Sequence, residues 1–309
     1  MIVAFLDLLG FSYLLKTDQK VALNNLNHFN NDLLRRESDD QKMDESDGDS
    51  VAKLRETSSI SSFLYMISFS DSLVLGSDQP DLFVKQLSGY LADLYIEFSE
   101  PFINPFKDIN EVHSLKDTTS LREGSRVEVK SDRAFPLLFR GGISYGKDVD
   151  FYQEYHIYEK TLKRNSLSVS GLTYLEAVEL EKAGKGPRLF CNKEVVDKIS
   201  DKAIIREVDA KKDIYEIIWT VQACEKLEHS KGIAAVHNSI YGTLLLPALN
   251  LYKYYKDKEV KDQYLELVKL VCRGSLIYAR KKSDQEYREV FNALSKILAD
   301  YYIKNILEI

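Results

Sequence analysis

The chain has 309 residues, of which 44% are hydrophobic and 29% are charged. This composition is typical of a folded protein, and the length allows one large domain or a domain with an appendage. The net charge of −6 excludes a protein that binds duplex nucleic acid through a dominant basic face.

The cysteines and the apolar runs indicate the cellular compartment of the protein. Cys191, Cys224 and Cys272 lie far apart and form no CxxC pair, which favours neither a disulfide framework nor a zinc site. The first apolar run is interrupted by Asp7 and lacks a basic flank, unlike a signal peptide. Later apolar runs fall short of the roughly 20 residues that cross a bilayer. We therefore expect a cytoplasmic protein without a membrane partner.

The N-terminal part of the chain predicts strands and helices in alternation. Short apolar runs closed by turn residues indicate strands, and apolar residues at intervals of three and four indicate helices. On these grounds we expect a strand at 2–9, a helix at 13–36, strands at 60–69 and 72–76 around a tight turn at Ser70–Asp71, and a helix at 81–100. The acidic segment 37–50 has no period and predicts a loop.

The middle of the chain continues the mixed pattern after an aperiodic insertion at 101–133. We expect a strand at 136–146 that contains Arg140 and a glycine pair, a helix at 171–183, a strand at 186–192, a helix at 193–199 and strands near 203–208 and 213–219. This order predicts an α+β fold of the ferredoxin-like, split βαβ plan, with antiparallel strands in its central sheet.

From Lys231 onward the pattern is helical only. Apolar stripes at 260–276 and 287–301 predict two helices, and Pro247 predicts a kink or a division in an earlier helix. We therefore expect a first domain at 1–222 and a helical C-terminal region at 223–309.

Asp7 is the least expected residue of the opening strand, because burying an unpaired carboxylate is costly. A second carboxylate, Asp71, stands at the tip of the predicted hairpin. In a split βαβ sheet the first strand and this hairpin are neighbours, so the two carboxylates can converge and would then need a cation between them. Each acid also has an ordinary interpretation as a turn residue. Together they predict a site for a divalent metal ion.

The turn after Asp7 supplies a second candidate binding feature, a set of backbone N–H groups. Gly10 and the backbone N–H groups of Phe11 and Ser12 stand where a helix begins, and a helix N-terminus binds phosphate. Carboxylates for Mg²⁺ or Mn²⁺ beside amides for a triphosphate are typical of a nucleotide site in which two metal ions stabilise an in-line displacement.

Four segments carry a resemblance to a known family. They are, in chain order, VAFLDLLGFS, FSDSLVL, FRGGISYG and GLTYLEAVELEKAGKGPRLF. Together they resemble the class III nucleotidyl cyclases, and they are most similar to the bacterial branch that includes the pyrimidine cyclases of anti-phage signalling. The resemblance implies that 1–222 is a cyclase-like domain.

The resemblance also implies a chemistry. Asp7 and Asp71 would hold two Mg²⁺ or Mn²⁺ ions, with the Leu8 carbonyl as a further candidate ligand. The 3′-hydroxyl of a nucleoside triphosphate would attack its own α-phosphorus, and pyrophosphate would leave. By the same resemblance the protein is a homodimer with sites completed across the interface. The resemblance further implies that its substrate would be a pyrimidine nucleoside triphosphate, UTP ahead of CTP, and that the cyclic mononucleotide would be a defence second messenger.

The sequence departs from the family on the helix predicted at 171–183. Many members carry there an Asn and an Arg that orient the ribose and stabilise the transition state, and alignment puts Leu175 and Glu179 at those positions. Neither residue supplies a positive charge. Arg140 is the favoured catalytic replacement, because a strand fixes the direction of its side chain. The alternatives are Lys163, Arg164 and Arg188.

Selection of the base is predicted on the strand that leads to Asp71. Positions 63, 65, 67 and 69 share one face of that strand, and among them Tyr65 has a polar group to contact a base. A plain core position is the competing interpretation of Tyr65.

Two other functions stay open. The first is a catalytically inactive, cyclase-like module that binds a nucleotide or a partner, which the missing Asn and Arg favour. The second is another metal-dependent phosphoryl-transfer enzyme built on a similar sheet.

Overall fold

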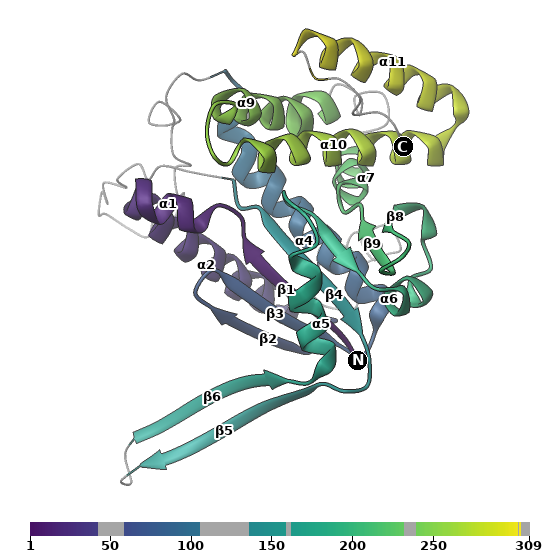
Figure 1. Cartoon of the computed structure of the whole chain (residues 1–309). Helices are drawn as coiled ribbons and strands as arrows, with labels where there is room; N and C mark the ends of the chain where they lie inside the picture. Colours follow the sequence, from purple (N-terminus) through teal and green to yellow (C-terminus); the bar gives the residue numbers. More distant parts are fainter. Residues whose placement is uncertain (43–58, 106–135, 159–161, 232–238, 302, 304–309) are drawn as a thin grey trace.

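The computed structural model describes residues 1–42, 59–105, 136–158, 162–231, 239–301 and 303 (Figure 1). Its N-terminal part consists of strand β1 (Ile2–Leu8), helices α1 (Phe11–Thr17) and α2 (Gln19–Lys42), strands β2 (Tyr65–Phe69) and β3 (Ser72–Ser77), and helix α4 (Pro80–Ser99), which continues into a 3-10 helix (Glu100–Phe102). The predicted order of these elements is confirmed.

Three boundaries differ from the prediction. The single helix predicted at 13–36 is two helices, because Asp18 ends α1 and its carboxylate accepts a hydrogen bond from Val21 N in the first turn of α2. α2 continues to Lys42, into the segment predicted as a loop. The apolar run before Tyr65 is a turn, in which Phe63 N donates to Ile60 O and both side chains are buried.

The chain then forms β4 (Phe139–Tyr145), β5 (Asp150–Tyr158), β6 (Leu162–Ser170), α5 (Leu172–Glu181), β7 (Leu189–Cys191), α6 (Lys193–Lys198), a 3-10 helix (Lys202–Ile204), β8 (Ile205–Asp209) and β9 (Ile214–Ile217). Every strand and helix predicted here is present. Most of the insertion predicted at 101–133 lies outside the described residues.

A seven-stranded sheet with the order β2-β3-β1-β4-β7-β9-β8 forms the centre of the molecule. β1 is antiparallel to both of its neighbours, β3 and β4, and β4 is parallel to β7. The first four strands and the helices between them follow a β-α-β-β-α-β order with the spatial sequence β2-β3-β1-β4. This is the ferredoxin-like, mostly antiparallel α+β fold that the sequence predicts.

The two faces of β1 have different surroundings, which explains how Asp7 fits into it. The even-numbered residues of β1 are buried in the main core with side chains of α2 and α4, whereas Val3 and Phe5 pack in a smaller cluster with residues of α5. Because alternate residues of a strand share a face, Asp7 continues the second set. Its carboxylate therefore lies outside the main core.

α5 packs directly on the sheet, because β4 carries the predicted glycine pair. A Cβ atom on Gly142 would lie 2.6 Å from Glu181 N and 2.7 Å from Leu180 Cβ, which is closer than such atoms approach. A glycine at this position therefore lets the end of α5 reach β4 and brings Glu181 beside Arg140.

The hairpin of β5 and β6 was not predicted. The two strands form a separate antiparallel sheet, which projects from the body of the molecule (Figure 1). At its base Phe151 stacks on Tyr65 of β2, with 4.3 Å between the ring centroids.

The C-terminal region is helical, as predicted. It contains α7 (Thr220–Lys231), a π-helix (Ile240–Leu245), α9 (Leu246–Tyr255), α10 (Lys261–Lys282) and α11 (Asp284–Asp300). Pro247 lies in the first turn of α9, directly after the π-helix, so the predicted irregularity is a change of helix type. In the described part of the chain, none of the helices is both long and apolar enough to cross a bilayer.

One continuous hydrophobic cluster includes side chains from β1, α4, α7, α9 and α10. The C-terminal helices thus pack on the same core as the sheet. The division into 1–222 and 223–309 falls inside α7 and stays a prediction.

Candidate active site

A cavity of about 570 Å³ opens where β1 ends. This volume is in the range of sites for small molecules and cofactors. Its walls come from the end of β1, the turn into α1, the tip of the β2–β3 hairpin, β4, the segment between α5 and β7, and the start of α10. All the predicted site residues except Tyr65 line it: Asp7, Leu8, Gly10, Phe11, Ser12, Asp71 and Arg140.

Asp7 is held between the two neighbours of β1. In the register of the sheet it faces Ser72 of β3 on one side and Arg140 of β4 on the other. Arg140 donates to Asp7 Oδ2 from Nη2 at 3.0 Å and from Nε at 3.2 Å, and Ser72 Oγ lies 3.5 Å from Asp7 Oδ1. The side chain of Asp7 keeps 23% of its surface exposed, so the carboxylate is paired and still reaches the cavity.

Arg140 is shared between two carboxylates. Besides Asp7 it forms an ion pair with Glu181, the last residue of α5, whose side chain is almost completely buried. The guanidinium has a third nitrogen, Nη1, that makes no such contact within the described residues. Arg140 therefore retains donors for a further anion.

The charge at this site is incompletely neutralised. Burial raises the pKa of Asp7, and the nearby Asp71 adds to this rise, while Arg140 opposes it. Burial likewise raises the pKa of Glu181, with Arg140 opposing and Asp7 adding. Two carboxylates, Asp7 and Glu181, thus share the Arg140 guanidinium, and a third, Asp71, acts electrostatically on Asp7. This arrangement favours an additional cation.

Asp71 is fixed at the tip of the hairpin by the backbone. Ser70 before it adopts a left-handed conformation with φ 54°, and the Asp71 carbonyl accepts a hydrogen bond from Leu8 N at 2.8 Å. The tip is thereby tied to the end of β1. The Asp71 carboxylate itself makes neither a hydrogen bond nor an ion pair with the described residues, and it faces the cavity.

The donor set suits Mg²⁺ or Mn²⁺. The oxygens of Asp7 and Asp71 and the backbone at Leu8 line one cavity, and hard cations prefer oxygen ligands. In the described ranges no group of three or more His, Cys, Asp or Glu is placed to hold a metal ion. Two carboxylates nevertheless fit Mg²⁺, which usually completes its shell with waters and substrate phosphates.

The turn at Gly10 has the predicted form. Gly10 caps α1 with φ 80° and ψ 4°, a conformation that favours glycine, and no side chain accepts a hydrogen bond from the first turn. Phe11 is buried in the core while Ser12 is exposed. The backbone of the turn therefore faces the cavity while Phe11 anchors it.

Two lysines that the sequence did not single out also line the cavity. Lys16 of α1 has no ion-pair partner in the described part of the chain, and Lys185, after α5, lies 2.8 Å from Asp262 of α10. Together with Arg140 they supply positive charge for an anionic ligand.

The structure does not bring Tyr65 to the cavity. It pairs with Gly76 at the end of the hairpin opposite to the tip, and its ring stacks on Phe151. The alternating pattern correctly placed Tyr65 on a strand, but a shared face does not bring a residue near the tip: Tyr65 precedes Asp71 by six residues, which is roughly 20 Å along an extended strand.

The structure also places most of the other residues that the sequence analysis considered for the missing Asn and Arg. Leu175 and Glu179 lie on the exposed side of α5, with 53% of Leu175 and 67% of the Glu179 side chain accessible. Arg188 is buried and paired with Glu216, with Nε 2.6 Å from Glu216 Oε1. The side chains of Lys163 and Arg164 lie outside the described part. Of the two candidates whose side chains are described, Arg140 and Arg188, Arg140 lines the cavity.

Comparisons with known proteins give distant likenesses. No family model matches the chain, and no curated protein matches it. The adenylyl cyclase CyaB from P. aeruginosa has a similar structure, with a TM-score of 0.40 and 14% identity over 70% of this chain and 92% of that one. The guanylyl cyclase Cya2 has a TM-score of 0.38 and 15% identity over 70% of this chain and 90% of that one. Both likenesses are too distant to say what this chain does.

Proposed function

We propose that this chain is a metal-dependent class III nucleotidyl cyclase that converts a nucleoside triphosphate into a 3′,5′-cyclic mononucleotide and pyrophosphate. One observation carries the proposal. Two carboxylates, an arginine and the Gly10 turn, which lie far apart in the sequence, face a single cavity at the end of the central strand.

The carboxylates of Asp7 and Asp71 are the metal-binding groups in this proposal, with the Leu8 carbonyl as a further ligand. Two Mg²⁺ or Mn²⁺ ions bound there would supply charge neutralisation for the phosphates and would lower the pKa of the attacking 3′-hydroxyl. Burial, and to a smaller extent the nearby Asp71, raises the pKa of Asp7, and a bound cation would offset the cost of keeping this carboxylate ionised.

In this proposal Arg140 and the Gly10 turn bind the phosphates of the substrate. Arg140 is oriented by Asp7 and Glu181 and offers its Nη1 to the α-phosphate, where negative charge develops as the new P–O bond forms. The N–H groups of the turn and the Lys16 ammonium hold the other phosphates, which leave as pyrophosphate. Arg140 thereby replaces the arginine that Glu179 cannot supply.

A homodimer is part of the proposal. Large hydrophobic side chains are exposed on α5 (Leu172 and Leu175) and on the β5–β6 hairpin (Tyr152 and Leu167). Exposed apolar surface of this kind marks interaction sites. A second copy carries the same Leu175 and Glu179, so a ribose-binding residue that it brings to the site would come from another part of its chain.

The choice of base and the biological setting rest on the sequence resemblance alone. We propose a pyrimidine substrate, UTP ahead of CTP, and a cyclic product that acts as a defence messenger in the cytoplasm. Because Tyr65 lies away from the cavity, its contact with a base remains a prediction.

The test is an assay of the purified protein with Mn²⁺ and each of ATP, GTP, CTP and UTP. We expect a cyclic mononucleotide and pyrophosphate, with UTP giving the highest rate. Binding of a nucleotide without any product would favour the inactive, nucleotide-binding module instead. Pyrophosphate without a cyclic product would indicate a different phosphoryl transfer. Either result contradicts the proposal.

A further inference from the structure

The start of α10 forms one wall of the cavity. Glu259, Val260 and Gln263 of the C-terminal region line it together with the Gly10 turn and Arg140. The helical region thus reaches the site that the sheet positions, and side chains on this wall face any bound ligand.

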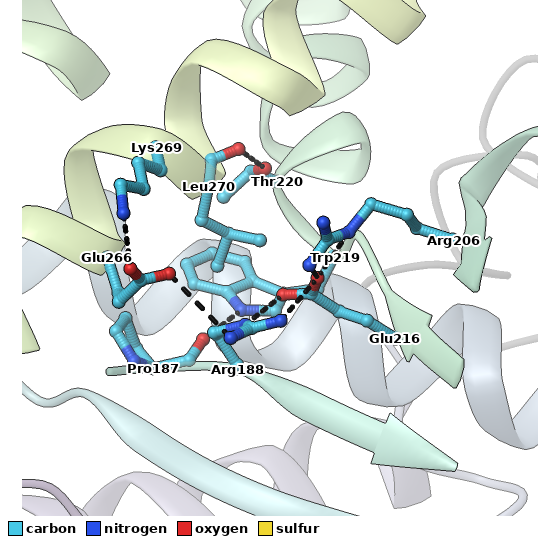
Figure 2. A network of polar contacts seen from close by, with 9 residues as sticks. All are labelled: Pro187, Arg188, Arg206, Glu216, Trp219, Thr220, Glu266, Lys269 and Leu270. Atoms are coloured by element: carbon cyan, nitrogen blue, oxygen red, sulfur yellow. Dashed lines mark hydrogen bonds and ion pairs between the residues drawn. The ribbon is translucent and has the colours of Figure 1, made fainter. Parts of the chain in front are cut away.

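Close packing and ion pairs hold this wall in place. Asp262 pairs with Lys185 at 2.8 Å, and a Cβ atom on Gly186 would lie 3.2 Å from Gln263 O. One turn further along α10, Glu266 lies 3.7 Å from Arg188 Nη1 and 2.7 Å from Lys269 Nζ (Figure 2). α10 is therefore anchored on the segment between α5 and β7.

Gln263 places an amide group over the Gly10 turn. Its Oε1 lies 3.9 Å from the point that a Cβ of Gly10 would occupy. The residue is half-buried, and its side chain has no hydrogen-bond partner among the described residues. Since the amide oxygen and nitrogen exchange places by a rotation of the terminal torsion, the NH₂ group can face the same point.

A neutral donor at this point suits a polyphosphate. Phosphate oxygens accept hydrogen bonds, and a hydrogen bond to a charged acceptor is stronger than one between neutral groups. The neighbouring Glu259 and Asp262 carry negative charge, and the Asp262 charge is already paired with Lys185. Gln263 is the polar residue of this wall that can approach an anion without repelling it.

We propose that Gln263 binds the polyphosphate of the nucleotide, so that the C-terminal helical region supplies a ligand-binding residue to the site; this rests on the proposed function. The residue touches substrate and is outside the segments that resemble the cyclase family.

The experiment titrates inorganic tripolyphosphate with Mg²⁺ into the full chain and measures the dissociation constant by calorimetry. Gln263→Ala should raise it about tenfold, the usual scale for one hydrogen bond to a charged group. Gln263→Glu, which keeps the shape, should raise it further because the carboxylate repels the phosphates. The control is Gln285→Ala on α11, whose amide bonds to Glu289, and it should bind as the wild type does.

A second measurement separates binding from chemistry. With the preferred triphosphate, Gln263→Ala should raise KM about tenfold and change kcat by less than about twofold. Equal affinity of wild type and Gln263→Ala, or an unimpaired Gln263→Glu, overturns the inference. So does a wild type that fails to bind tripolyphosphate. A wild type that binds it but forms no cyclic product contradicts the proposed function and leaves the role of Gln263 supported.

Discussion

Asp71→Asn should reduce the rate of cyclic nucleotide formation by at least about a hundredfold, because a bound metal ion supplies several kcal/mol of transition-state stabilisation. Asparagine keeps the shape of the side chain but removes the negative charge of the proposed metal ligand. The Asp71 carboxylate makes no hydrogen bond or ion pair with the described residues, so the free energy of unfolding should stay nearly unchanged. The measurement is the initial rate with Mn²⁺ and the preferred triphosphate, with thermal unfolding recorded in parallel.

Asp78→Asn is the matched control for this variant. Asp78 follows the same hairpin at the far end of β3, is exposed and does not line the cavity. Its activity should stay within about twofold of the wild type, as expected for a surface change away from the site. An active Asp71→Asn, or an equal loss in Asp78→Asn, would exclude Asp71 as a specific metal ligand.

Glu216→Gln should lower the free energy of unfolding by about 3–5 kcal/mol at pH 7, the cost of removing one partner of a buried ion pair. Glu216 is fully buried and accepts hydrogen bonds from both Arg188 and Arg206 (Figure 2). Glutamine is neutral, so the buried guanidinium of Arg188 loses its nearer counter-charge and keeps the more distant Glu266 at 3.7 Å. Urea unfolding followed by circular dichroism measures the difference.

The effect of Glu216→Gln should depend on pH. Burial favours the neutral acid, but the two arginines outweigh it and hold the pKa of Glu216 below its ordinary value. A lowered pKa contributes stability above the unfolded-state value of about 4.3, and this stability is lost as the pH falls through the folded-state pKa. The difference in the free energy of unfolding between the wild type and Glu216→Gln should therefore become smaller as the pH falls.

Glu207→Gln is the control for this prediction. Glu207 lies on the neighbouring strand β8, is exposed, and should change stability by less than about 0.5 kcal/mol. A loss below about 1 kcal/mol for Glu216→Gln at pH 7 would show that the network in Figure 2 contributes little to stability. A difference in unfolding free energy that widens in acid would contradict the lowered pKa of Glu216.

The parts of the site that follow β1 and the hairpin could be predicted because each has a local signal. Asp7 interrupts an apolar strand, Asp71 occupies a two-residue turn, and Gly10 directly precedes a helix. The β-α-β-β order then determines that these points are neighbours in the sheet. Local pattern and topology together were sufficient to predict that Asp7, Asp71 and the Gly10 turn, the residues proposed to bind metal and phosphate, line one cavity.

Other parts could not be predicted because their signal is not local. Gln263 is a polar residue in an amphipathic helix, and its sequence neighbours do not show that its side chain faces the Gly10 turn. The hydrophobic residues of the β5–β6 hairpin do not alternate regularly with polar ones, and the hairpin is separate from the main sheet, so its sequence does not show the period of a half-buried strand. Tyr65 shares a strand and a face with residues near the turn, but the residues between Tyr65 and Asp71 separate it from the tip, and alternation alone does not measure that separation against the size of the site.

The central claim is that Asp7 and Asp71 bind divalent cations beside a triphosphate. Electron paramagnetic resonance of Mn²⁺ tests it directly, with a 3′-deoxy nucleoside triphosphate that lacks the attacking hydroxyl. We predict two bound Mn²⁺ ions per chain in the wild type and loss of this binding when both residues are changed to Asn. The same amount of bound Mn²⁺ in the doubly substituted protein would contradict the claim.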